Sequence, residues 1–171
     1  ICHKYGLKFY LHLTCVMVSK QIMSQHPDWA RIDMNTGETF TNSYGCQVTC
    51  FNNQEFMDEF CKRLDRLIAE VNPDGLMQDE IQFFRHTCCG CDSCRAKYLK
   101  DTGNQAPANA SELDYGRNPN AYQWFNWRGQ SAKENMTRVR SILKKYGKDK
   151  IMLAYLANNS SSGAFISAGL S

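Results

Sequence analysis

The sequence lacks any apolar run close to the ~20 residues that a transmembrane helix needs. It also has no positively charged segment followed by an apolar core, the pattern of a signal peptide. The excess of one charge sign over the other is small as well, with a formal net charge of +3. The dense basic stretch at 143–150 is typical of a solvated helix end. Neither a nucleic acid nor a membrane is therefore expected as a partner.

The composition is that of one globular domain. Of the 171 residues, 43% are hydrophobic and 22% are charged, which suffices for a buried core and argues against disorder. The chain opens on Ile1 in the middle of what looks like a structural element, and it closes on "FISAGLS" without a recognisable stop. We expect residues 1–171 to be the central fragment of one larger domain, truncated at both ends.

Short apolar runs alternate with longer amphipathic segments. The short runs predict buried strands at 7–15, 75–80 and 150–156. The amphipathic segments predict helices at 53–71, from Asp92 or Ser93 to 101–103, and at 120–146. Residues 104–119 have no period and predict a long loop. Strands joined by connections far longer than hairpins indicate an α/β fold, with a parallel sheet and helices outside it.

Two adjacent acids, Asp79 and Glu80, close the second predicted strand. In α/β folds the carboxyl ends of the strands carry the chemistry, and one of two neighbouring side chains there would face the mouth of the site. A partly desolvated carboxylate in that position could act as a general acid or base. A surface turn or a helix cap explains an Asp-Glu pair equally well, so the local pattern leaves both interpretations open.

Nine cysteines, an odd number, cannot all pair within one chain, and four of them crowd into "CCGCDSC" at 88–94. Sulfurs spaced as CxxC ahead of a helix are typical of a tetrahedral zinc site. The fourth ligand could be Cys50 or Cys46, or all four could be local. We favour the set Cys50, Cys89, Cys91 and Cys94. Four thiolates leave no open position, so such a zinc would be structural; free thiols, a disulfide and a redox pair are the alternatives.

Several motifs follow one another in a familiar order: "HPDW" at 26–29, "TGE" at 36–38, Cys50 ahead of a helix, a strand ending in two acids, and CxCxxC opening another helix. This order resembles the family-42 β-galactosidases and their glycoside-hydrolase-like relatives among the clan A (β/α)8 barrels. The resemblance covers most of residues 5–158. It implies that the three predicted strands are about the third to fifth strands of a TIM barrel, a partial barrel braced by a zinc loop.

The resemblance also implies a function: a glycosidase that acts on a carbohydrate by carboxylate acid/base catalysis with retention. Glu80 falls on the acid/base, and Cys50, Cys89, Cys91 and Cys94 fall on the zinc ligands. The nucleophile sits on the seventh strand in that family and would lie outside this chain. Asp79 stands where the family has asparagine. An ionised aspartate only accepts hydrogen bonds and would raise the pKa of Glu80, so we expect Asp79 to orient substrate and tune its neighbour.

Further residues complete the expected site. Trp29, in a loop after a strand, is the candidate platform for a sugar ring, and Asn158, just past the third strand, could reach substrate hydroxyls. Trp124 and Trp127 are expected to pack in the core, and His12 is expected to be a core histidine inside its strand.

Two rival functions remain compatible with these residues. One is a barrel relative that binds carbohydrate without cleaving it. The other is a small zinc-stabilised interaction module in which the acids play no part. Each is compatible with a homo-oligomer.

Overall fold

The computed structural model describes residues 1–14, 16–79, 82–83, 85–114 and 116–154. The main sheet consists of β1 (Tyr10–Thr14), β4 (Gly75–Asp79) and β5 (Ile151–Ala154). The helices are α1 (Lys20–Gln25), α2 (Gln54–Val71), α3 (Asp92–Thr102) and α4 (Pro119–Lys145). A small second sheet pairs β2 (Met17–Val18) with β3 (Gln47–Val48). Short 3-10 helices are η1 (Cys2–Tyr5), η2 (Pro27–Trp29) and η3 (Ala110–Leu113).

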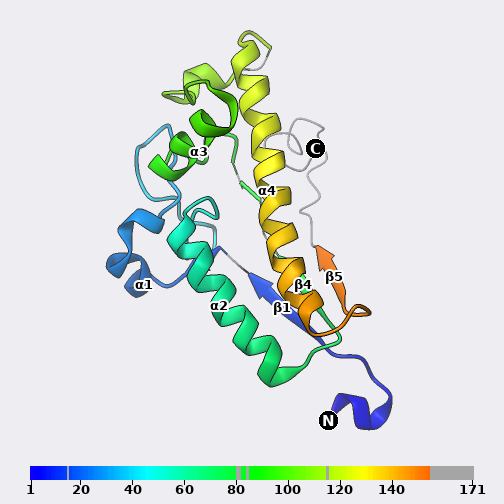
Figure 1. Cartoon of the computed structure of the whole chain (residues 1–171). Helices are drawn as coiled ribbons and strands as arrows, with labels where there is room; N and C mark the ends of the chain where they lie inside the picture. Colours follow the sequence, from blue (N-terminus) through cyan, green and yellow to red (C-terminus); the bar gives the residue numbers. More distant parts are fainter. Residues whose placement is uncertain (15, 80–81, 84, 115, 155–171) are drawn as a thin grey trace.

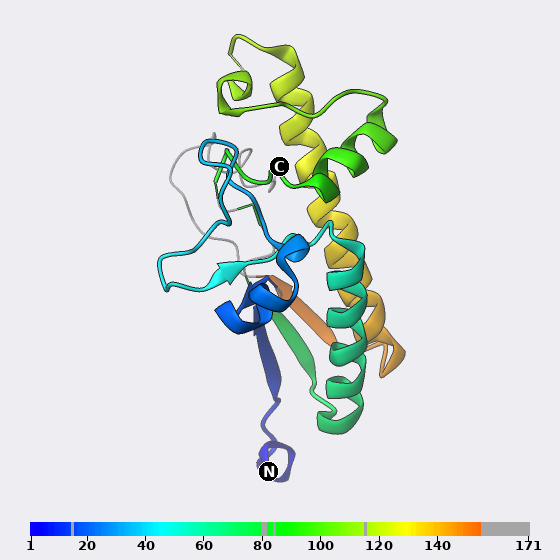
Figure 2. The ribbon, with the colours of Figure 1, turned by 90° about the vertical axis from the view of Figure 1, so that its left-hand side faces the viewer.

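The three strands of the main sheet are parallel, in the order β1-β4-β5, with Thr14 opposite Asp79 and Gln78 opposite Ala154. Helices α2 and α4 lie on the same side of this sheet (Figures 1 and 2). The parallel α/β arrangement predicted from the sequence is therefore confirmed. Helix α3 lies beyond the carboxyl ends of the strands (Figure 1), which is the end where α/β folds carry their chemistry.

The two faces of the sheet differ in exposure. Leu76 is fully buried beneath the helices, and Leu11, Leu13 and Met152 pack against the same core. Side chains one position along point the other way, because successive residues of a strand face opposite sides. His12 is one of these: 57% of its side chain is exposed. The expectation of a core histidine is therefore wrong. In a closed barrel this second face would line the interior.

Helix α2 begins and ends where the sequence predicts. The Asn53 side chain accepts a hydrogen bond from the backbone N–H of Phe56 at 2.9 Å, which caps the first turn. Asn72 adopts the left-handed conformation with φ 47° directly before Pro73, and the helix stops there. The buried side of the helix carries Phe56, Met57, Cys61, Leu64 and Ile68. This stripe packs the helix against the sheet and against α4.

The segment between α3 and α4 is a loop interrupted by η3, close to the prediction of a long loop over 104–119. Helix α4 starts at Pro119, with the Asn118 side chain accepting from the backbone N–H of Asn120 at 3.0 Å. Trp124 and Trp127 stack at 4.9 Å between ring centroids, and Tyr98 from α3 packs edge-on against both. Both tryptophans are buried, as predicted, and they hold α3 against α4.

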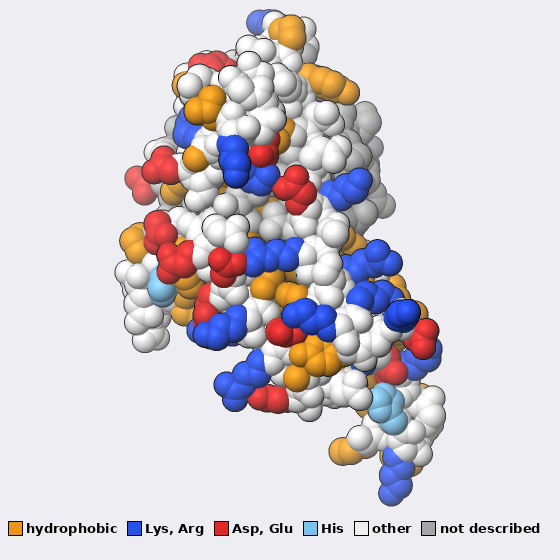
Figure 3. Space-filling view, in the orientation of Figure 1, with side chains coloured by type: hydrophobic (Ala, Val, Ile, Leu, Met, Phe, Trp, Pro, Cys, Tyr) orange, Lys and Arg blue, Asp and Glu red, His pale blue; other side chains and the backbone are white. Residues whose placement is uncertain are grey.

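The outer surface mixes charges of both signs. Lysine and arginine side chains alternate with aspartate and glutamate over the face that Figure 3 shows, and α2 contributes the pairs Arg63–Glu59 and Arg66–Glu70 at 2.7 Å each. This agrees with the even charge distribution seen in the sequence. Within the described part of the chain, none of the helices has the length and apolar character required to cross a membrane.

Candidate functional site

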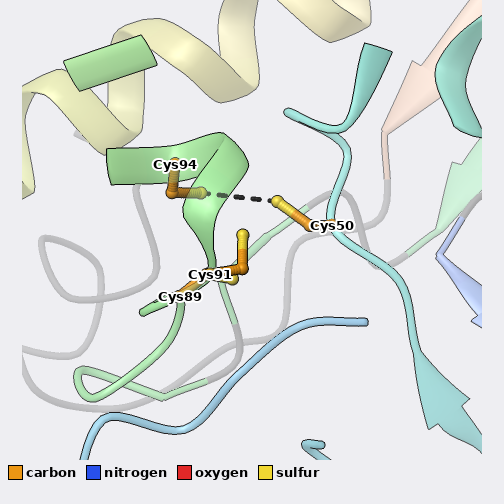
Figure 4. A group of neighbouring side chains, drawn as sticks. All are labelled: Cys50, Cys89, Cys91 and Cys94. Carbon is orange, nitrogen blue, oxygen red and sulfur yellow. Dashed lines mark hydrogen bonds between the residues drawn. The ribbon is translucent and has the colours of Figure 1, made fainter. Parts of the chain in front are cut away.

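Four buried cysteines come together beyond the carboxyl end of the sheet (Figure 4). Cys50 comes from the segment between β3 and α2, Cys89 and Cys91 precede α3, and Cys94 lies in its first turn. Their sulfur atoms all lie within 4.8 Å of one another, and the Cys50 and Cys94 Sγ atoms are 3.4 Å apart. Sulfurs bound to a tetrahedral zinc at ~2.3 Å would stand about 3.8 Å apart, so the four positions fit a metal ion.

These are the four cysteines that the sequence analysis favours. Cys46 is partly exposed and Cys88 is buried, but neither belongs to the cluster. The backbone explains why the four converge. Gly90 donates its N–H to the Ile32 carbonyl at 2.8 Å, and a Cβ there would stand 2.8 Å from Met34 Cγ, so a larger residue would force the Met34 side chain to move. The CxC segment is thereby held against the 31–34 strand-like stretch.

Burial and hydrogen bonds among the sulfurs shift the pKa values of the thiols. The pKa of Cys50 is raised well above its usual value, chiefly by hydrogen bonding to Cys89 and Cys91. Burial and the neighbouring sulfurs raise the pKa of Cys94. Burial acts to raise the pKa of Cys89 too, but the hydrogen bonds from its three neighbours outweigh burial and leave that pKa well below its usual value. A buried divalent cation would replace the thiol protons, because thiolates are its ligands.

Two buried arginines lie beside the cysteines. Arg31 and Arg128 are both 0% exposed, and their guanidinium groups stack on the Phe83 ring at 5.5 Å and 4.4 Å from its centroid. Burial lowers the pKa of Arg128 to about 9, while the nearby thiols of Cys88 and Cys94 act in the opposite direction. A divalent metal with four thiolates carries a charge of about −2, so two buried cations suit it electrically.

These arginines were not among the site residues predicted from the sequence. Arg128 donates from Nη1 to the His86 carbonyl and from Nη2 to the Arg85 carbonyl, each at 2.9 Å, which braces the loop between β4 and the cysteines. A signal was present: Arg128 follows the buried Trp124 by four residues and so lies on the same face of the helix. An arginine on the buried face of an amphipathic helix indicates a partner in the core.

The acid pair stands at the carboxyl end of the middle strand. Asp79 is the last residue of β4, and its Oδ2 lies 2.9 Å from Nε2 of His12 on β1. Among the described residues its other oxygen, Oδ1, is buried without a hydrogen-bond partner. Glu80 follows Asp79 in the sequence and, like Asn158, lies outside the described residues. His12 is a further candidate site residue that the sequence analysis misses.

Trp29 lies apart from the acid pair in sequence and packs beside α2. It is 6% exposed, stacks on His26 at 3.8 Å between ring centroids, and contacts Phe56 at 5.4 Å. It borders a pocket of about 250 Å³ between α1 and α2. Other residues of this pocket include Met17, Ile22, His26, Phe60 and Arg63. The role of Trp29 as a sugar platform stays a prediction.

Comparison with known proteins places these features in context. Residues 1–80 match a family described as "Hypothetical glycosyl hydrolase 6". No match was found among curated protein sequences.

Several solved structures share the fold. The α-L-fucosidase isoenzyme 2 from Paenibacillus thiaminolyticus is 16% identical with a TM-score of 0.64, over 98% of this chain and 23% of that one. The PgaB (BpsB) glycoside hydrolase domain from Bordetella bronchiseptica is 16% identical with a TM-score of 0.66, over 88% of this chain and 42% of that one. The β-galactosidase from Bacillus circulans sp. alkalophilus is 15% identical with a TM-score of 0.64, over 89% of this chain and 27% of that one.

The chain thus spans less than half of each of these structures. The described residues share the arrangement of parallel strands and outer helices with part of each of these folds. The resemblance to glycoside-hydrolase-like (β/α)8 barrels, as a partial barrel, is therefore confirmed.

Proposed function

We propose that this chain forms the central βα units of a (β/α)8-barrel glycoside hydrolase and that Glu80 is its catalytic acid/base. The observation that carries the proposal is the position of Asp79. It ends the middle strand of the parallel sheet, on the face away from the helices, and it is hydrogen-bonded to His12. Glu80 is the next residue, past the last residue of β4, so the alternation of side chains along the strand does not direct it to the helices; this edge is where barrel enzymes hold their catalytic groups.

The comparisons support the same function. The family match concerns glycosyl hydrolases, and the similar structures include a fucosidase and a β-galactosidase. Since the chain spans 23% of the fucosidase and 27% of the β-galactosidase, a second carboxylate would come from another part of the protein. In a retaining enzyme that carboxylate stands about 5–5.5 Å from the acid/base and attacks the anomeric carbon.

The chemistry assigned to this chain is proton transfer. Glu80 donates a proton to the glycosidic oxygen as the bond to the anomeric carbon breaks, and the same carboxylate then takes a proton from the attacking water. Asp79, held by His12, accepts a hydrogen bond from a substrate hydroxyl. The substrate is a carbohydrate, and Trp29 and Asn158 are its further candidate contacts.

The four cysteines hold a structural zinc in this proposal. A set of four sulfurs suits tetrahedral zinc and leaves no coordination position for substrate or water. The ion would tie the Cys50 segment to the start of α3, and so brace the loop that follows the acid pair. The spacing of the sulfurs and the burial of all four cysteines support this assignment.

The role of Glu80 is tested by Glu80→Gln in the full-length protein, with aryl and alkyl glycosides of fucose and galactose as a first panel. General acid catalysis contributes about 10²–10⁴-fold, so hydrolysis of an alkyl glycoside should fall by that factor. An aryl glycoside with a good leaving group needs less protonation and should lose much less. Glu70→Gln, an exposed change on α2, is the matched control. Equal losses on both substrate types would contradict the role of Glu80 as the acid.

A further inference from the structure

A chain of hydrogen bonds links helix α4 to the cysteine cluster. The Ser131 hydroxyl on α4 donates to Asn52 Oδ1 at 2.5 Å, across 79 positions of sequence. Asn52 Nδ2 donates to Cys94 Sγ at 3.3 Å, and the backbone N–H of Asn52 donates to Cys50 Sγ at 3.4 Å. One residue therefore contacts two of the four sulfurs without being a ligand itself.

The Asn52 amide is bound at both ends. An asparagine side chain has one oxygen that accepts and one nitrogen that donates, whereas a serine hydroxyl can do either. A thiolate sulfur only accepts, so the nitrogen faces Cys94, and Ser131, 1% exposed, donates to the oxygen. Ser131 Oγ thus satisfies the end of the amide that faces away from the cluster and holds the amide between α4 and Cys94.

A donor at this position favours thiolates. Four thiolates around a divalent ion leave a net negative charge in a buried place, and N–H groups that point at sulfur stabilise that charge. The Asn52 side chain and backbone supply two such donors, to Cys94 and Cys50. Both sulfurs are fully buried, so water does not reach them to do the same.

We propose that Asn52 is a positioning residue of the metal centre and that Ser131 on α4 holds it in the orientation needed for tight metal binding. The inference rests on the proposed occupation of the four-cysteine site by zinc. It makes metal affinity depend on the docking of α4, which no ligand spacing in the sequence indicates. The loop between β4 and α3 is then fastened to α4 through the metal as well as through Arg128.

The test compares zinc affinity in three variants of the full-length protein by competition with a chromophoric chelator. Asn52→Asp keeps the shape and the bond from Ser131 but places a carboxylate oxygen against Cys94. Loss of such outer partners typically costs 10–100-fold in metal affinity, and we expect this range. Ser131→Ala frees the amide to turn and should cost about tenfold. Ser141→Ala is the matched control, because Ser141 Oγ on the same helix donates only to the Thr137 carbonyl.

Two further measurements separate positioning from folding. Cobalt substituted for zinc should show an altered sulfur-to-metal charge-transfer band in Asn52→Asp, and an unaltered one in Ser141→Ala. The double variant Asn52→Asp/Ser131→Ala should bind zinc no more weakly than Asn52→Asp, because both changes interrupt the same chain of hydrogen bonds from Ser131 through Asn52 to Cys94. Unchanged affinity and spectra in both single variants would overturn the inference, even with a zinc-loaded parent protein. A parent protein that binds no zinc would overturn both it and the proposed metal.

Discussion

His12 on β1 and Asp79 on β4 are hydrogen-bonded across two neighbouring strands, with 2.9 Å between His12 Nε2 and Asp79 Oδ2. The two residues are not opposite each other in the register, because Asp79 pairs with Thr14 and His12 with Met77. The imidazole therefore reaches towards the carboxyl end of the sheet. Asp79 Oδ1 is buried and has no hydrogen-bond partner among the described residues, so the contact with His12 is the one that orients this carboxylate.

Removing this contact should lower activity without unfolding the protein. In His12→Ala, Asp79 loses the hydrogen bond that orients it, because alanine has no side-chain donor. We expect kcat/KM for a glycoside substrate to fall by roughly 10–100-fold while the thermal midpoint changes little. Steady-state kinetics and thermal unfolding provide the two readouts.

The control for this variant is a similar pair at the opposite, amino end of β4. His3 Nε2 lies 2.7 Å from Asp74 Oδ2, directly before β4 begins, so His3→Ala removes the same kind of pair at the amino edge. That edge has no assigned chemistry, and activity should stay within about twofold of the parent. Similar kinetic losses in both variants would show that His12 has no special role.

Much of the fold could be predicted from the sequence because its signals are local. The helix at 53–71 has a cap, a 3.6-residue period and a stop, and α2 begins within one residue of the prediction. Strand ends are set by partners instead. The first strand was predicted over 7–15, but β1 starts at Tyr10, opposite Gly75, the first residue of β4. Residues 7–9 therefore extend beyond the pairing, and no local pattern reports this.

The candidate site divides in the same way. The spacing within 88–94 points to three ligands, whereas Cys50 lies 44 positions from Cys94 and is joined to it only by the fold. His12 was assigned to the core because strands of parallel sheets are usually buried on both faces, and here the described helices cover one face. Arg31 and Arg128 were missed because charged residues are rarely expected at 0% exposure.

The metal centre predicts a difference between two buried cysteines. Cys50→Ser removes one sulfur of the cluster, so zinc content should fall from about one ion per chain to near zero on dialysis, because the ion loses a quarter of its ligands. The unfolding midpoint in urea should fall with it, since metal binding and folding are coupled. Metal analysis and urea unfolding measure the two effects.

Cys61→Ser is the matched control for this change. Cys61 is 8% exposed in the buried stripe of α2 and lies outside the four-sulfur cluster. It should lose some stability through the buried hydroxyl but keep its zinc. Treatment of the parent protein with a strong chelator should reproduce the Cys50→Ser result. If Cys50→Ser retains a full equivalent of zinc, the proposed ligand set is wrong.

Arg128 predicts a loss of stability that depends on the metal. Arg128→Gln leaves the negative centre without one of its two buried cations and removes bonds to the Arg85 and His86 carbonyls. Breaking a buried charge pair costs about 3–5 kcal/mol, so we expect a loss of that order in urea unfolding of the zinc-loaded protein. The loss should be smaller in metal-free protein, where the sulfurs carry less charge.

Arg138→Gln, on the same helix but in a surface pair with Asp58, should cost about 0–1 kcal/mol in either state. An equal loss for Arg128→Gln with and without zinc would mean that Arg128 acts through the carbonyls alone.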